Sequence, residues 1–198
     1  MADILTSKAT AILVFETGDV FHGQGIGATG EAVGEVCFNT AMTGYQEILT
    51  DPSYASQIVC FTFPHIGNTG TTEEDEEATT PAARRAARGA IFKASVTPAS
   101  NWRSEGELGD WLKARGIIGM SGVDTRAVTS FIRDNGMPKG IIAHSETGEF
   151  DIADLIDLYA RPGQKLCWPV TVPVVAWRCG FWRENIAIKR TLRSYWPL

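Results

Sequence analysis

The hydrophobic and polar positions in the first half of the chain follow the patterns of β-strands. An apolar run over 11–15 is followed by turn residues at 16–19, and an extended pattern resumes over 20–22. This arrangement predicts a β-hairpin. Residues 31–38 alternate as a strand does, and the β-formers of 57–63 are typical of a buried strand. The first half is therefore expected to be mostly β-structure.

In the second half, apolar positions at helical spacing alternate with short apolar runs. Ser104 and Asp124 are the predicted N-caps of the first two long helices. Helices are expected over 43–49, 104–115, 124–135 and 151–159, and strands over 90–96, 117–120 and 140–143. Asn135-Gly136 closes the second long helix, because glycine adopts the left-handed conformation at low cost. This alternation indicates a mixed α and β fold.

A glycine-rich segment contains a literal GxGxxG motif, Gly-Ile-Gly-Ala-Thr-Gly, over residues 25–30. A dinucleotide site needs a strand before this motif and a helix that begins inside it. Here a strand pattern follows, over 31–38, so turns between strands are the favoured interpretation. A dinucleotide site is the alternative.

Cysteine and histidine spacing gives no metal pattern. The four cysteines at 37, 60, 167 and 179 form no CxxC pair, and the three histidines form no HxxxH or HExxH pattern. No metal site is therefore expected. Cys37 and Cys60 lie in apolar runs and are predicted to be buried, structural thiols. The acidic run 73–77 is predicted to be a solvated loop.

Charge divides the chain at about residue 160. The whole chain of 198 residues carries a formal net charge of −5; by position, residues 1–160 carry −11 and residues 161–198 carry +6. Four of the six tryptophans also lie in the second segment. A shift this sharp indicates a boundary. The acidic first segment argues against a nucleic-acid partner, because phosphate binding needs a basic face.

Targeting signals and membrane spans are not found in the sequence. No apolar run approaches the roughly 18 residues that a membrane-spanning helix needs. The first ten residues have no apolar stretch after a basic cluster, as a secretory signal would. We therefore expect a cytoplasmic protein with no membrane partner.

The local sequence alone suggests two candidate functional side chains, Ser53 and His65. Ser53 follows Asp51-Pro52 at the start of a predicted strand, where a serine often only bonds its own backbone. His65 lies with Asn68 in a loop dense in turn residues, a common place for functional groups. Neither has a catalytic partner nearby in the sequence. These residues alone indicate a soluble domain of mixed α and β structure and no particular reaction.

Residues 38–54, which end in Thr-Asp-Pro-Ser-Tyr, carry a specific resemblance together with 57–59 and 63–70. They closely resemble the N-terminal domain of the small chain of glutamine-dependent carbamoyl-phosphate synthase. Further matches flank this block, at 21–23, 26–28, 34–36, 100–103 and 122–126. The resemblance covers about residues 8–160, so we expect that interval to form one domain and 161–198 to be an unmatched tail.

The resemblance implies a swivelling β/β/α-type fold and a role in a two-chain ligase. In this family the small chain hydrolyses glutamine and delivers ammonia to a large chain. The large chain uses ATP, with Mg²⁺, and bicarbonate to make carbamoyl phosphate for arginine and pyrimidine biosynthesis. The serine of the Thr-Asp-Pro-Ser-Tyr motif contributes to the glutamine site, and Ser53 is the matching residue here. No catalytic residue, cofactor or metal ligand is implied on this chain.

The sequence departs from the family in its second half. Its cysteines are in no Gly-x-Cys-x-Gly elbow, the motif that carries the family's glutaminase nucleophile. We therefore expect the chain alone to lack glutaminase activity, and a non-catalytic binding or scaffold module is the alternative function. Two hypotheses are open for 161–198: an out-of-frame translation, or a genuine basic extension that binds an acidic partner or a membrane surface.

Overall fold

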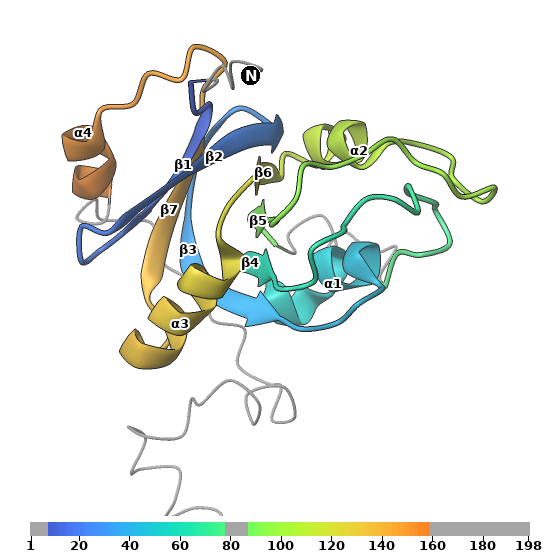
Figure 1. The fold of residues 1–198 in the computed structure, drawn as a ribbon, viewed down its shortest axis with the longest axis horizontal. Helices are drawn as coiled ribbons and strands as arrows, with labels where there is room; N and C mark the ends of the chain where they lie inside the picture. Colours follow the sequence, from blue (N-terminus) through green and yellow to red (C-terminus); the bar gives the residue numbers. More distant parts are fainter. Residues whose placement is uncertain (1–7, 78–86, 159–198) are drawn as a thin grey trace, which may run out of the picture.

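Seven strands close into a barrel in the computed structural model, which describes residues 8–77 and 87–158 (Figure 1). The strands are β1 (Ala11–Phe15), β2 (Val20–Gly27), β3 (Gly30–Asn39), β4 (Ile58–Phe61), β5 (Gly89–Ile91), β6 (Ile118–Ser121) and β7 (Lys139–His144). The helices are α1 (Tyr45–Thr50), α2 (Leu108–Ala114), α3 (Thr125–Asn135) and α4 (Ile152–Asp157), with a 3₁₀-helix, η1 (Pro52–Tyr54). The predicted mixed α and β class is confirmed.

The barrel order is β1-β2-β6-β5-β4-β3-β7, and β7 closes it against β1. The pairs β3–β4, β4–β5 and β5–β6 are parallel, and the other four pairs are antiparallel. His144 is opposite Ala11 on one side and Gly30 on the other. Strand β7, the last strand in the described ranges, therefore joins β1 to β3.

Strand β1 is apolar at every position because both of its faces are buried. Leu13 and Phe15 belong to the core inside the barrel, to which α3 adds Val128 and Ile132. Ile12 lies on the other face, in a cluster that includes residues of α4. Helix α4 thus covers the outside of the barrel at β1, which explains the continuous apolar run.

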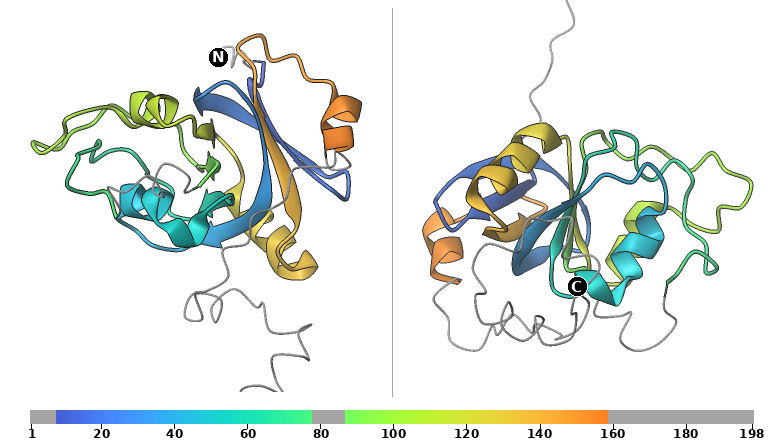
Figure 2. Two further views of the ribbon diagram at one scale, coloured as in Figure 1. Left: turned by 180° about the vertical axis from the view of Figure 1, so that it is seen from behind. Right: turned by 90° about the horizontal axis from the view of Figure 1, so that it is seen from below.

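A second outer core covers the parallel strands. Val59 and Phe61 of β4 pack with Leu49 of α1 and with Leu108 and Leu112 of α2. Figure 2 shows α1 and α2 together on one side of the barrel, with α4 on the other side. The two outer cores therefore lie on different sides of the barrel.

Several sequence predictions are confirmed. The β1–β2 hairpin turns at Gly18, whose φ is +91°. The GxGxxG motif spans the end of β2, the turn at 28–29 and the start of β3, with positive φ at Gly27 and Gly30. Helix α3 begins after Asp124, whose side chain accepts from two backbone N–H groups, and Gly136 follows its end with φ +78°. Local signals alone were sufficient for these elements.

The predicted helix over 104–115 begins later than expected, so the assignment of Ser104 as its N-cap is wrong. Helix α2 begins at Leu108, and Ser104 Oγ donates instead to Gly106 O at 3.1 Å. Thr71 forms an isolated bridge with Gly106 and accepts from the N–H of Glu105 at 2.9 Å. Pairing with a distant loop therefore uses the backbone that the first helical turn would have needed.

The predicted strand over 90–96 is also shorter than expected. Strand β5 ends at Ile91, although Phe92 still donates to Met120 O at 2.7 Å. The N–H of Ala94 then donates to Pro64 O at 3.3 Å, outside the barrel ladder. The segment leaves the sheet to contact the loop after β4.

Some expectations concern features that the structure describes only in part. The tail 161–198 and its two cysteines lie outside the described residues, as does Tyr159 at the end of the helix predicted over 151–159. None of the helices in the described ranges combines the length and apolar character that crossing a membrane demands. Across 8–77 and 87–158, no three His, Cys, Asp or Glu side chains group as metal ligands would.

Candidate functional site

Ser53 lies in η1, the single 3₁₀ turn that joins α1 to the segment before β4. The Asp51 carboxylate accepts the Ser53 N–H at 2.7 Å, and Asp51 O accepts the Tyr54 N–H at 3.0 Å. Pro52 sits at the first position of this turn, where its missing N–H costs nothing. Asp51 and Pro52, which precede Ser53 in the sequence, therefore fix its backbone.

Tyr54 fixes the same turn from the other side. Asn39 Nδ2, at the end of β3, donates to the Tyr54 hydroxyl at 3.0 Å. Asn39 Oδ1 accepts the Ala41 N–H at 2.7 Å, and Asn39 O accepts the Thr62 N–H at 3.0 Å. Asn39 thus ties η1 to the ends of two parallel strands, and the position of Ser53 depends on the barrel.

Helix α1 is clamped to the loop after β4 by two buried polar side chains. Gln46, 2% exposed, donates from Nε2 to Thr72 O at 2.5 Å and accepts the Thr72 N–H at 3.0 Å. The Tyr45 hydroxyl bonds Thr69 Oγ1 at 2.8 Å and donates to Gly70 O. Burial is the main cause of a raised Tyr45 pKa, so this hydroxyl remains a donor.

The Ser53 hydroxyl itself is left available. Ser53 is half-buried, and its Oγ has no hydrogen-bond partner among the residues that the structure describes. A hydroxyl offers one donor and two acceptor positions. The arrangement is that of a held backbone with an uncommitted polar group, which can bind a polar ligand. Among the described residues, no hydrogen bond joins this hydroxyl to a base that would make it a nucleophile.

His65 is not brought to Ser53. It is exposed and follows β4, whereas Ser53 precedes that strand. Its ring lies edge-on to Phe63, with centroids 6.4 Å apart. No hydrogen bond within the described ranges joins His65 to Ser53. The two candidates therefore do not form a catalytic pair.

The two described cysteines are buried, as predicted. Cys37 is 3% exposed and Cys60 is fully buried in the barrel core. Burial raises the pKa of the Cys60 thiol to about 12, so it stays protonated at neutral pH. Since neither thiol reaches the surface, neither can attack a substrate.

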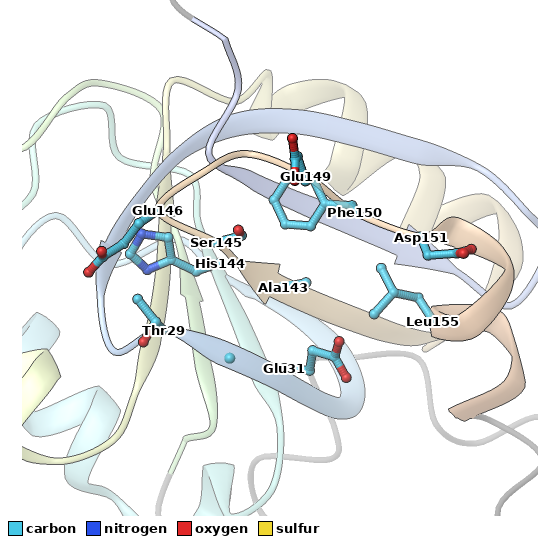
Figure 3. A pocket seen from close by; sticks show the side chains of 11 residues that line it. Thr29, Glu31, Ala143, His144, Ser145, Glu146, Glu149, Phe150, Asp151 and Leu155 are labelled. Atoms are coloured by element: carbon cyan, nitrogen blue, oxygen red, sulfur yellow. The ribbon is translucent and has the colours of Figure 1, made fainter.

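A groove of about 540 Å³, which Ser53 does not line, lies between α4 and the paired strands β3 and β7 (Figure 3). Phe150 and Leu155 give it an apolar floor. Its acidic lining residues are Glu31, Glu146, Glu149 and Asp151. The carboxylate of Asp151 is used within the fold, because it caps α4 by accepting the N–H groups of Ala153 at 2.9 Å and Asp154 at 3.2 Å.

His144 also lines this groove, and it too has a structural partner. Its Nδ1 lies 2.9 Å from Ala28 O, in the turn between β2 and β3. Its ring packs so closely on Gly25 that a Cβ there would lie 1.9 Å from the ring. The histidine therefore serves to pack this end of the barrel.

The sequence names Ser53 as a candidate, and its role stays a prediction; the sequence does not reveal the side chains that hold its surroundings. Asn39, Tyr45 and Gln46 lie inside the motif 38–54, so their identity was visible. Their roles were not, because Thr72 is 26 positions from Gln46 and Gly70 is 25 positions from Tyr45. A signal for such pairs exists only in three dimensions.

Comparison with known proteins agrees with these motifs. Residues 13–142 match the model of a family described as "Carbamoyl-phosphate synthase small chain, CPSase domain". A carbamoyl phosphate synthase small chain from Mesorhizobium japonicum is 56% identical over 180 residues, which cover 91% of this chain and 45% of the relative. This match is longer than the interval 8–160 assigned to the domain, and that boundary stays a prediction.

Two further relatives are more similar over a shorter stretch. The Agrobacterium fabrum small chain is 63% identical over 150 residues, covering 76% of this chain and 37% of the relative. The Rhizobium meliloti small chain is 62% identical over 148 residues, which cover 75% of this chain and 37% of the relative. This chain spans less than half the length of these relatives. It belongs to the carbamoyl-phosphate synthase small chain family and corresponds to the N-terminal part of such a chain.

Proposed function

We propose that this chain forms the N-terminal part of the glutamine-hydrolysing small chain of carbamoyl-phosphate synthase. The complete small chain releases ammonia from L-glutamine for a large chain, which makes carbamoyl phosphate from bicarbonate and Mg-ATP. The product serves arginine and pyrimidine biosynthesis in the cytoplasm. In this proposal residues 8–160 are one domain of the swivelling β/β/α type, which packs on the large chain. Membership of the family supports this role.

The observation that carries the proposal is the uncommitted hydroxyl of Ser53. The turn is held on both sides of this hydroxyl. The Asp51 carboxylate accepts the Ser53 N–H at 2.7 Å, and the Tyr54 hydroxyl accepts from Asn39 Nδ2 at 3.0 Å. A fixed hydroxyl loses little entropy when it binds a ligand. Glutamine carries an amide, a carboxylate and an ammonium group, any of which a hydroxyl can hydrogen-bond. Ser53 is thus proposed as a glutamine-binding residue, not as a nucleophile.

Hydrolysis is proposed to occur outside the described part of this chain. Cys37 and Cys60 are both buried, and the raised pKa of Cys60 keeps that thiol neutral. The proposed role of this domain is therefore to complete a glutamine site whose nucleophile another part of the small chain supplies. By itself, the chain is proposed to have no glutaminase activity.

A reconstitution experiment tests this function. The chain is mixed with the large chain of the Mesorhizobium japonicum enzyme and with the part of that small chain that follows the matched region. Glutamine-dependent carbamoyl phosphate formation is expected, and Ser53→Ala is expected to raise the KM for glutamine about tenfold or more, as loss of a hydrogen bond to a charged ligand does. Ser130→Ala, in α3, is the matched control and should leave KM unchanged.

Carbamoyl phosphate synthesis from added ammonia is the control for a damaged complex. It does not need glutamine, so Ser53→Ala should leave its rate unchanged. Binding to the large chain without glutamine-dependent synthesis would favour the scaffold alternative. Normal glutamine kinetics in Ser53→Ala would show that Ser53 does not bind this substrate.

A further inference from the structure

The acidic run 73–77, predicted to be a solvated loop, is solvated only in part. The Glu74 side chain is 82% exposed, whereas that of Glu76 is 16% exposed. Glu76 Oε1 accepts from the indole Nε1 of Trp111 at 3.4 Å and forms an ion pair with Arg115 Nη2. A carboxylate this buried needs polar and charged partners to replace the water that it has lost. Glu76 is therefore committed to contacts within the fold.

Both partners of Glu76 belong to α2, Trp111 within the helix and Arg115 at its C-cap. The Arg115 guanidinium lies over the Trp111 ring, with Cζ 4.8 Å from the ring centroid. The helix is anchored in the outer core by Leu108 and Leu112. Because the indole already restricts the arginine, the ion pair costs less side-chain entropy than an exposed pair does. Glu76 thus attaches its loop to a rigid part of the fold.

The same loop contacts the C-terminal end of α1, which lies with α2 on one side of the barrel (Figure 2). The N–H of Glu77 donates to Thr50 Oγ1 at 3.0 Å. This hydroxyl is buried, and it donates to the carbonyl oxygens of Gln46 at 2.9 Å and Glu47 at 3.2 Å. Since Glu76 and Glu77 are adjacent, the ion pair to α2 also holds the residue that ends α1.

A short and stiff connection joins the end of α1 to Ser53. Only Asp51 and Pro52 separate Thr50 from Ser53, and proline fixes its own φ. Asp51 is the C-cap of α1 and the N-cap of η1, and its carboxylate accepts the Ser53 N–H at 2.7 Å. A displacement of Thr50 is therefore passed on to the turn that carries Ser53.

We propose that Glu76, held by its two partners on α2, is a positioning residue for the hydroxyl of Ser53. It acts through the backbone, by keeping the end of α1 and the turn η1 in place. The proposal rests on the proposed function, which makes Ser53 a glutamine-binding residue. The N–H of Ala87 donates to Leu49 O at 3.2 Å and keeps a second hold on the end of α1. Loss of Glu76 should therefore weaken glutamine binding without abolishing it.

Amide hydrogen exchange in the full 198-residue chain tests the positioning role directly. Glu76→Ala is expected to make the Glu77 and Ser53 amides exchange about tenfold faster, the change that corresponds to loss of one hydrogen bond to a charged group. Glu74→Ala is the matched control from the same acidic run. It removes an exposed ion pair with Arg103 and should leave both rates unchanged.

The reconstituted enzyme described above provides the functional measurement. Glu76→Ala and Arg115→Ala are each expected to raise the KM for glutamine about fivefold, less than Ser53→Ala does, because the hydroxyl is still present. The double variant should raise KM no further, since both changes remove one interaction. Glu76→Gln keeps an acceptor oxygen for Trp111 and should recover part of the affinity. The kcat and synthesis from added ammonia should not change, whereas a loss of folded enzyme would lower kcat and leave KM as it was.

The outcomes separate the positioning role from the proposed function. Faster Ser53 exchange and a raised KM in Glu76→Ala, with Glu74→Ala unaffected, support both. If Ser53→Ala raises KM and Glu76→Ala does not, the positioning role is overturned and the proposed function stands. If Ser53→Ala leaves KM unchanged, Ser53 does not bind glutamine and both fail. Unchanged Ser53 exchange in Glu76→Ala overturns the positioning role in every case, and this measurement alone decides it if no glutamine-dependent synthesis is recovered.

Discussion

Gln46 provides the sharpest test of how the candidate site is held together. Its side chain makes two hydrogen bonds to the backbone of Thr72, at 2.5 Å and 3.0 Å, and Gln46 and Thr72 are 2% and 8% exposed. The substitution Gln46→Ala removes both bonds and leaves a buried N–H and a buried C=O of Thr72 without partners.

The size of the effect follows from these two groups. Each buried backbone group left unsatisfied costs about 1–3 kcal/mol. Because Thr72 is near the surface, water can reach part of the space, so we expect Gln46→Ala to lower the free energy of unfolding by about 2–4 kcal/mol. Glu47→Ala, on the same helix but half-exposed, is the matched control and should change it by no more than about 0.5 kcal/mol.

Urea unfolding followed by circular dichroism measures the free energy difference, and hydrogen exchange at the Thr72 amide measures the local effect. The Thr72 amide should exchange faster in Gln46→Ala than in Glu47→Ala. A loss of less than about 1 kcal/mol, with the Thr72 amide still protected, would refute the view that Gln46 clamps this loop.

Substitutions at three further positions probe other parts of the fold. Asp124→Ala removes the cap of α3 and should cost about 1 kcal/mol in urea unfolding, whereas Asp124→Asn should cost much less. Gly25→Ala places a Cβ against the His144 ring and should lower the melting temperature; an unchanged value would contradict the close packing. Burial raises the pKa of Glu35, so the folded protein holds this proton more tightly than the unfolded chain and loses stability as pH rises through the raised pKa. The free energy of unfolding of Glu35→Gln, measured by urea titration, should therefore rise relative to that of the unaltered chain as pH increases through the raised pKa of Glu35. A difference in stability that does not change with pH would exclude the raised pKa of Glu35 as its cause.

The sequence was sufficient where a few adjacent residues decide the structure. The cap at Asp124, the glycine after Asn135 and the hairpin turn at Gly18 were all predicted, because each depends on local backbone chemistry. The start of α2 was not predicted, since Thr71 competes for the backbone near Gly106 from 35 positions away. Local propensity cannot anticipate a competitor so distant in sequence.

In the candidate site, too, contacts between neighbouring residues could be predicted and contacts between distant residues could not. The motif that ends at Tyr54 makes Ser53 a candidate, a role that stays a prediction, and the bond of its N–H to the Asp51 carboxylate is a local feature. The hydrogen bonds from Asn39 to Tyr54 and from Gln46 to Thr72 join residues 15 and 26 positions apart. These contacts depend on how the barrel and α1 pack, which no periodicity reveals.

Barrel closure has a consequence for how this domain is made. Strand β7 pairs with both β1 and β3, so its register joins Ala11 and Gly30 to the same residue, His144. During synthesis from the N-terminus, β1 and β3 each keep an unpaired edge until this last strand leaves the ribosome. Such edges invite pairing with other chains. The nascent domain is thus most exposed to aggregation just before its final strand arrives, and a chain cut short before residue 139 would keep those edges open permanently.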